Sequence, residues 1–162
     1  MSAAIEITNL RFAWPKQNQA CLAFEKLSIE KGQHCFLEGK SGSGKTTLLN
    51  IMAGIFPAQQ GEIQMLDTRV DRLSNQQKDR FRADHMGIIF QQFNLLPYLT
   101  VEQNILLPLR FSQKRQAKEP QAAEHLTHLL ETLQLPNSLR KQSAKNLSIG
   151  QQQRVAVARA MM

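Results

Sequence analysis

The sequence is poor in cysteine, and its two cysteines, Cys21 and Cys35, are too few and too awkwardly spaced for a disulfide framework or a zinc site. Cys35 lies in an apolar run, so we expect it to be buried. No apolar run approaches the about 18 residues that a membrane-spanning helix needs. The N-terminus has no basic flank followed by an apolar stretch, so we expect no signal peptide. These absences predict a reduced, cytoplasmic protein that does not cross a membrane by itself.

Acidic residues are also in the minority, with 13 Asp and Glu against 20 Lys and Arg and a net charge of +7. The basic residues are spread along the chain, and only Lys114, Arg115 and Lys118 form a loose cluster. A nucleic-acid binder more often concentrates its charge on one face or helix. The charge therefore favours a basic surface that meets anionic ligands and could lie near a membrane. The apolar share of 42% is ordinary for one folded domain.

The first third of the chain is typical of strands. Apolar and polar residues alternate, fully or in part, at residues 5–8, 22–24 and 27–29. Residues 34–38 form a short, mostly apolar run that ends at a glycine loop, as a buried strand would. Leucines and isoleucines then recur at helical spacing as far as Gly54, where a helix commonly stops. A strand, a glycine loop and a helix follow one another in the order that phosphate binding requires.

Strand and helix patterns alternate again before the chain becomes helical. Residues 61–66 and 86–90 have strand patterns, and the capping-box spacing of Ser74 and Gln77 starts a polar helix that reaches about Asp84. Thr100 and Gln103 form another capping box, and Pro108 ends or kinks the helix that begins there. Alanines and leucines form one apolar stripe over residues 122–133.

These patterns predict an α/β fold in one domain, residues 1–162. A β subdomain with antiparallel N-terminal strands and a phosphate-loop core would occupy residues 1–91. A helical subdomain inserted into that core would occupy residues 92–146, and residues 147–162 would form a last motif and its helix.

A glycine-rich loop matches the pattern G-x-x-x-x-G-K-[ST]. Its residues are Gly39, Lys40, Ser41, Gly42, Ser43, Gly44, Lys45 and Thr46. Glycines let backbone N–H groups approach a phosphate closely, and the next helix points its positive end at the same anion. Lys45 would reach the β- and γ-phosphates, Thr46 would coordinate Mg²⁺, and Thr47 would add a contact near the α-phosphate. A chance match or a flexible glycine-serine linker are the alternatives, and the flanking strand and helix patterns oppose them. The loop predicts that the chain binds ATP with Mg²⁺.

A second motif starts another helix, over the residues Leu-Ser-Ile-Gly-Gln-Gln-Gln-Arg from Leu147 to Arg154. Ser148 can cap that helix, and Gln151 stands in capping-box position. The motif resembles the signature of ATP-binding cassette (ABC) proteins, usually Leu-Ser-Gly-Gly-Gln followed by Gln-Arg. Ile149 replaces the usual first glycine and adds bulk. An ordinary capped helix is the alternative, and the phosphate loop upstream argues against it.

The resemblance implies a shared site. In ABC proteins two domains pair head to tail, so Ser148 and Gly150, with Gln151 beside them, would contact the γ-phosphate of ATP held by the loop of a second copy. Gln91 resembles the glutamine that touches Mg²⁺ and the attacking water. Trp14 stands in the place of the aromatic residue that stacks on adenine, although a packed core tryptophan is the alternative.

Residues 90–97 and 99–104 are similar to exporters of the macrolide and lipoprotein-releasing type. In that subfamily this region receives the coupling helices of the membrane subunit. The resemblance implies a transmembrane permease that contacts residues 91–107 through helix-in-groove recognition. It also implies that the protein lies peripherally on the inner face of the cell membrane.

The sequence departs from the family pattern after Met162. A complete ABC domain would continue, within about ten residues, into an apolar strand that ends in the Asp for Mg²⁺ and the Glu that polarises water, and later into a switch histidine. We therefore expect an incomplete core sheet with exposed apolar surface, and little or no hydrolysis by these 162 residues.

Three functions fit the sequence. The first is the ATP-binding subunit of a membrane transporter, an ATPase in its complete form. The second is a soluble ABC ATPase that acts on DNA or ribosomes, although the stretch between Gln91 and Leu147 is too short for the insertions of DNA-acting members. We therefore expect no nucleic-acid partner. The third is a non-catalytic module that pairs with full-length partners.

Overall fold

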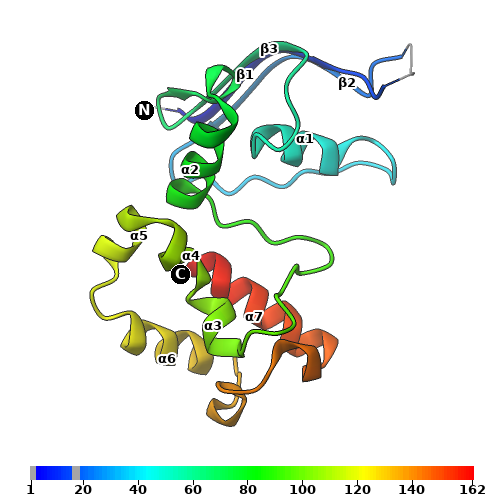
Figure 1. Ribbon diagram of the computed structural model, residues 1–162. Coiled ribbons are helices and arrows are strands. Elements are labelled where there is room, and N and C mark those ends of the chain that lie inside the picture. The colour runs from blue at the N-terminus through cyan, green and yellow to red at the C-terminus, as the bar shows by residue number, and fades with distance from the viewer. Residues whose placement is uncertain (1–2, 16–18) are drawn as a thin grey trace. The chain divides into compact units, whose positions relative to one another are not determined.

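The computed structural model describes residues 3–15 and 19–162 (Figure 1). The chain divides into two compact units, Met1–Lys78 and Asp79–Met162, which we call the sheet unit and the helical unit. The boundary after Lys78 lies earlier in the chain than the subdomain boundary predicted after Gln91. The predicted subdomain boundary stays a prediction. In the described part of the chain, no helix is both long enough and apolar enough to cross a membrane.

The sheet unit is built on four antiparallel strands in the order β2-β1-β3-β4. Their bounds are Ala3–Phe12 for β1, Leu22–Glu30 for β2, Gln60–Met65 for β3 and Thr68–Arg69 for β4. Ile7 pairs with Leu27 on one side and Ile63 on the other, and both isoleucines are buried. The antiparallel N-terminal strands that the sequence predicted are confirmed, with residues 22–24 and 27–29 joined in one strand.

One helix and one short turn complete the sheet unit. Helix α1 (Lys45–Met52) follows the glycine loop and buries Thr47, Leu48 and Ile51 on one face. The 3₁₀ turn η1 (Val70–Arg72) follows β4 directly. The expected helix after the loop is therefore present, and it ends close to Gly54, as predicted.

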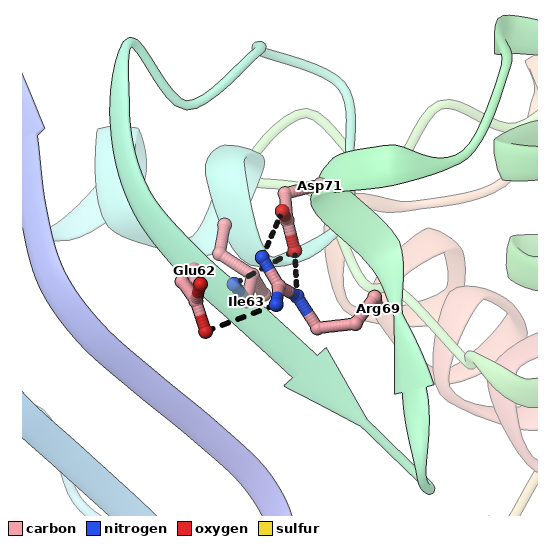
Figure 2. A network of polar contacts seen from close by, with 4 residues as sticks. All are labelled: Glu62, Ile63, Arg69 and Asp71. Atoms are coloured by element: carbon pink, nitrogen blue, oxygen red, sulfur yellow. Dashed lines mark hydrogen bonds and ion pairs between the residues drawn. The ribbon is translucent and has the colours of Figure 1, made fainter.

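A polar network fastens η1 to β3 (Figure 2). Arg69 bridges two carboxylates, with its Nη1 2.9 Å from Glu62 Oε2 and its Nη2 2.7 Å from Asp71 Oδ2. The Ile63 amide donates to Asp71 Oδ1 at 3.0 Å. Burial opposes the ionisation of Asp71, but the hydrogen bonds from Arg69 and Ile63 outweigh it and lower the pKa of Asp71.

The helical unit contains most of the helices. They are α2 (Asn75–His85, which starts in the sheet unit), α3 (Val101–Ile105), α4 (Leu107–Phe111), α5 (Gln113–Lys118), α6 (Ala122–Thr132), η2 (Asn137–Leu139), η3 (Ala144–Asn146) and α7 (Ile149–Met161). The predicted stripe on α6 is confirmed, because Leu126, Leu129 and Leu130 join one core cluster with α3 and α7. Pro108 stands in the first turn of α4, where its missing N–H leaves no gap in the helix.

Each capping box that the sequence predicted is formed. The Gln77 amide donates to Ser74 Oγ at 3.3 Å, and the Ser74 amide donates to Gln77 Oε1 at 2.9 Å. Thr100 with Gln103, and Ser148 with Gln151, make the same reciprocal pair. These predictions depended only on residues three positions apart, which is why the sequence was sufficient.

The prediction of buried strands at residues 34–38 and 86–90 is wrong for the structure. Neither segment pairs as a strand with any described residue. Phe36 is 88% exposed and Ile89 is 48% exposed, and Cys35, expected to be buried, is exposed too. A buried parallel strand is held by neighbours on its edges, so an apolar run without such neighbours stays irregular.

Candidate nucleotide-binding site

The glycine loop folds back on the side chain of Lys45. Lys45 Nζ donates to the carbonyl of Gly39 at 2.6 Å and to that of Lys40 at 2.8 Å. Ser43 Oγ lies 3.5 Å from the same ammonium group. The contacts hold the loop in a closed turn, with the positive charge of Lys45 against the loop backbone. Ser41, Gly42 and Ser43 are exposed to solvent, so the outer side of the loop is open to a ligand.

The start of α1 leaves its first N–H groups without a side-chain cap. The N-cap is Gly44, in the left-handed conformation with φ 89°, and no acidic side chain stands in the first turn. The first N–H groups of a helix lack partners within the helix, and the helix dipole adds positive potential there. This is the arrangement that binds phosphate in glycine loops, and the residues present fit an anionic phosphate group.

Gly44 also allows a close approach to the sheet. A Cβ at this position would lie 2.8 Å from Leu22 Cδ2, closer than two carbon atoms can pack. The positive φ adds strain for any residue with a side chain. The positive φ of the turn therefore favours glycine at position 44, and a side chain there would also require Leu22 to shift.

The two threonines that follow Lys45 differ in exposure. Thr46 is exposed, so its hydroxyl is available to a metal ion or to phosphate. Thr47 is only 8% exposed and belongs to the buried face of α1. Their predicted roles at Mg²⁺ and near the α-phosphate stay predictions.

Trp14 packs in an aromatic cluster of the sheet unit. Its ring meets Phe12 edge-on with the centroids 5.2 Å apart, and Phe56 edge-on with the centroids 5.3 Å apart. The tryptophan is 36% exposed. It therefore has packing partners and an open side, and adenine stacking stays a prediction. Phe56 was missed from the sequence, because it lies outside any periodic pattern and far from Trp14 along the chain.

Gln91 lies in an exposed turn of the helical unit. The loop after it passes through Phe93 and Asn94, which have positive φ angles of 58° and 48°. Arg159 of α7 donates to the carbonyls of both residues, at 2.6 Å and 2.7 Å. Sequence reasoning missed Arg159, which stands inside the repeating apolar pattern of α7 and carries no local signal.

The signature segment forms the start of α7. Ser148 is the N-cap, and its Oγ accepts a hydrogen bond from the Gln151 amide at 3.3 Å while the Ser148 amide donates to Gln151 Oε1 at 2.9 Å. Open space surrounds Gly150, since a Cβ there would meet nothing within 4 Å. Ile149 is 76% exposed beside it. The segment therefore presents an open, capped helix start to solvent.

The predicted site residues fall into both units. The loop from Gly39 to Thr47 and Trp14 belong to the sheet unit, whereas Gln91 and the signature segment belong to the helical unit. Among the described residues, no group of three or more His, Cys, Asp and Glu side chains could hold a metal ion. Within one unit, the structure brings together the glycine loop and the start of α1.

A glycine loop that opens a helix beside a sheet, with its lysine turned onto the loop backbone, defines a P-loop nucleotide-binding domain. Comparison with known proteins shows to which family of P-loop proteins the chain belongs. A family model described as "ABC transporter" matches residues 25–162. The chain belongs to the ABC transporter family.

Several relatives and solved structures are similar to this chain. The "Uncharacterized ABC transporter ATP-binding protein YvcR" of Bacillus subtilis is 43% identical over 144 residues, which are 89% of this chain and 54% of that protein. The "Lipoprotein-releasing system ATP-binding protein LolD" of Francisella tularensis is 35% identical over 147 residues, which are 91% of this chain and 62% of that protein. The chain thus spans about half to three fifths of the length of these two relatives.

The fold has a close counterpart among solved structures. The structure described as "Dimeric Structure of MJ0796, a Bacterial ABC Transporter Cassette" matches with a TM-score of 0.84 at 31% identity. The match covers 97% of this chain and 68% of that chain, and a protein named MJ0796 comes from Methanocaldococcus jannaschii. The P-loop fold and the family are thereby supported independently.

Proposed function

We propose that this chain is the ATP-binding part of an ABC membrane transporter, and that it binds MgATP at the loop from Gly39 to Thr47. The observation that carries the proposal is the uncapped start of α1 behind the closed glycine loop, with Lys45 Nζ turned onto the carbonyls of Gly39 and Lys40. Relatives named as ATP-binding proteins of transport systems support the choice of ATP and of transport.

Lys45 is placed to exchange partners when a nucleotide binds. Its ammonium group would leave the carbonyls of Gly39 and Lys40 and donate to the β- and γ-phosphates, which carry full negative charge. The amides at the start of α1 would donate to the same phosphates. Thr46 and Gln91 would hold Mg²⁺, which neutralises the charge that develops when the terminal phosphoryl group is transferred.

The second half of the site would come from another copy of the chain. Ser148 Oγ accepts the hydrogen bond of its capping box, so the hydroxyl hydrogen stays available for a γ-phosphate oxygen. Gly150 has open space on its Cβ side, which lets a ligand or a partner chain approach the backbone. A head-to-tail homodimer would bring these groups and Gln151 to the loop of the partner, where ATP would be hydrolysed. Solved cassettes described as dimeric support this arrangement.

A transmembrane permease is the other proposed partner, and it would contact residues 91–107. Tyr98 is 76% exposed within this region, although aromatic side chains are usually at least partly covered. Relatives described as "Bacitracin export ATP-binding protein BceA" and "Macrolide export ATP-binding/permease protein MacB" support an exporter. The protein would then lie on the cytoplasmic face of the membrane, bound to that permease.

Nucleotide binding is tested by titrating the purified chain with ATP and Mg²⁺ in a calorimeter. Lys45→Ala should weaken binding by about 10- to 100-fold, because charged hydrogen bonds to phosphate contribute about 1.5–3 kcal/mol each. Lys118→Ala is the matched control, since it removes an exposed lysine of α5 from the other unit. Equal affinity of wild type and Lys45→Ala would contradict the proposal.

Dimer formation is tested by sedimentation with and without MgATP. The wild-type chain should shift toward a dimer when MgATP is added, and Ser148→Ala should reduce that shift. If ATP binds but sedimentation does not change, the proposal of a site shared by two copies is contradicted. The proposal that the phosphate loop binds ATP would be unaffected.

A further inference from the structure

The side chain of Arg159 links the last turn of α7 to the loop after Gln91. Arg159 Nη2 donates to the Phe93 carbonyl at 2.6 Å, and Nη1 donates to the Asn94 carbonyl at 2.7 Å. The two bonds come from the two terminal nitrogens of one planar guanidinium group, so they fix the direction of the loop as well as its distance. All of these residues belong to the helical unit.

The loop needs such support because its backbone is strained. Phe93 and Asn94 both have positive φ, and this left-handed conformation costs roughly 1–2 kcal/mol for a bulky residue such as Phe93, whereas asparagine tolerates it better. The loop has two internal bonds, from the Phe93 amide to the Phe90 carbonyl at 2.9 Å and from the Asn94 amide to the Gln92 carbonyl at 2.6 Å. The carbonyls of Phe93 and Asn94 accept their hydrogen bonds from Arg159, outside the turn.

A second contact lies on the other side of Gln91. A Cβ added to Gly87 would stand 2.2 Å from the carbonyl oxygen of Ala160, so the Gly87 backbone lies directly against α7. Ala160 is the neighbour of Arg159. The same turn of α7 therefore touches the chain both before and after Gln91.

The helix that makes these contacts is the one that starts with the signature. Helix α7 runs from Ile149 to Met161, and its Val155, Ala156 and Ala158 are buried in the core of the helical unit. Arg159 itself is half-buried, and burial lowers its pKa below the ordinary value of arginine. The guanidinium of Arg159 is partly removed from water, and burying a neutral side chain at this position would cost less free energy.

We propose that Arg159 is a positioning residue that ties the Gln91 loop to the signature helix, so that the two parts of the site move as one body. The inference rests on the proposed function, in which Gln91 and Ser148 act on MgATP. A nucleotide held by the partner would contact Ser148, and the resulting shift of α7 would reach Gln91. Two contacts would carry it: the hydrogen bonds of Arg159 and the packing of Gly87 against Ala160.

The contact is tested first without nucleotide, by hydrogen exchange of the backbone amides. Arg159→Gln should speed exchange of the Phe93 and Asn94 amides about tenfold or more, because the two charged hydrogen bonds that hold this turn are lost. Arg110→Gln, a change of an exposed arginine on α4, should leave these residues unchanged. Unchanged exchange in Arg159→Gln would overturn the proposal. If Arg159→Gln unfolds the helical unit, Arg159→Met decides, because methionine keeps an apolar stem and has no donor for the two carbonyls. It should keep the core protected and loosen only the loop, and a loop as protected as in wild type would contradict the proposal.

The functional effect is tested by the gain in ATP affinity on adding Mg²⁺. Gln91→Ala and Arg159→Gln should each reduce this gain, and the double variant should reduce it no further than Gln91→Ala alone. Affinity without Mg²⁺ should stay within about twofold of wild type, because the phosphate loop is untouched. A loss of thermal stability with an unchanged gain would show a merely structural role and overturn the proposal. If Lys45→Ala binds ATP as wild type does, the proposed function fails, whereas the exchange measurement still decides the contact of Arg159.

Discussion

Helices α1 and α7 begin in opposite ways. The start of α1 has Gly44 as its N-cap, in the left-handed conformation and without any side-chain hydrogen bond. The start of α7 has a complete capping box from Ser148 and Gln151. The two helix starts carry the two motifs that place the chain in its family, and they differ in how many N–H groups they leave to a ligand.

The difference separates a primary anion site from a supporting one. A capping box satisfies two N–H groups from within the chain, so the start of α7 is stable without a ligand. The start of α1 has no such internal partner, and its free N–H groups favour an anion. We therefore expect α1 to hold the nucleotide in the single chain, and α7 to contribute only when a second copy brings it near.

The largest expected effect comes from an alanine at the start of α1. Gly44→Ala should lower the free energy of unfolding by about 1–3 kcal/mol, because the positive φ and the contact with Leu22 both oppose a Cβ. It should also weaken ATP binding by about tenfold or more, because the α1 amides move. Urea unfolding and calorimetric titration measure the two effects.

The matched change on the other helix should have the opposite sign. Gly150→Ala meets nothing within 4 Å and lies in the first turn of α7, so it should raise the free energy of unfolding by up to about 1 kcal/mol. Equal loss of stability in the two variants would contradict the contrast between the two helix starts.

Removing the cap of α7 should have a smaller effect, which in the single chain is an effect on stability alone. Ser148→Ala should lower the free energy of unfolding by about 1 kcal/mol, because the Gln151 amide loses its acceptor. ATP affinity should stay within about twofold of wild type when it is measured well below the concentration at which the chain dimerises. A large loss of affinity in the single chain would show that α7 already contacts the nucleotide of its own copy.

The smallest effect concerns pH and compares ion pairs in the two units. A hydrogen bond from Arg140 lowers the pKa of Glu102 in the helical unit, despite some burial of the carboxylate. Because the folded pKa is the lower one, this stabilisation is present above the ordinary value of 4.5 and is lost as the pH falls through the folded pKa. Asp71 behaves in the same sense in the sheet unit, below 3.8.

Thermal unfolding between pH 7 and pH 3 tests whether the stabilisation by Glu102 is lost at a higher pH than that by Asp71. Glu102→Gln should flatten the decline of melting temperature that sets in as the pH falls below 4.5, and Asp71→Asn should flatten the decline only at lower pH. Arg110→Gln serves as the control. A melting temperature of Glu102→Gln that declines just as in wild type would exclude a stabilising role for the pair with Arg140.

Local features of the fold could be predicted from the sequence, and features that depend on distant partners could not. The capping boxes need only two residues three positions apart, and the α6 stripe needs only its own period. Residues 34–38 and 86–90 have strand patterns, but a strand forms only where a neighbour pairs with it. No property of a single segment reveals whether that neighbour is present.

The candidate site shows the same division. The glycine loop and the signature were visible as motifs, and the structure gives them the expected loop and capped helix start. The contact of Arg159 with Asn94 joins residues 65 apart in the sequence. Nothing in the pattern of α7 distinguishes this arginine from one that faces solvent, so only the folded chain could reveal it.

The start of α1 is the proposed primary phosphate site, and an ATP titration followed by amide NMR tests this directly. At protein concentrations below dimer formation, added MgATP should shift the amide signals of Gly42, Gly44, Lys45 and Thr46. The amide of Gln151 should stay unshifted, because its capping box needs no ligand. Shifts at Gln151 with unshifted loop amides would contradict the account.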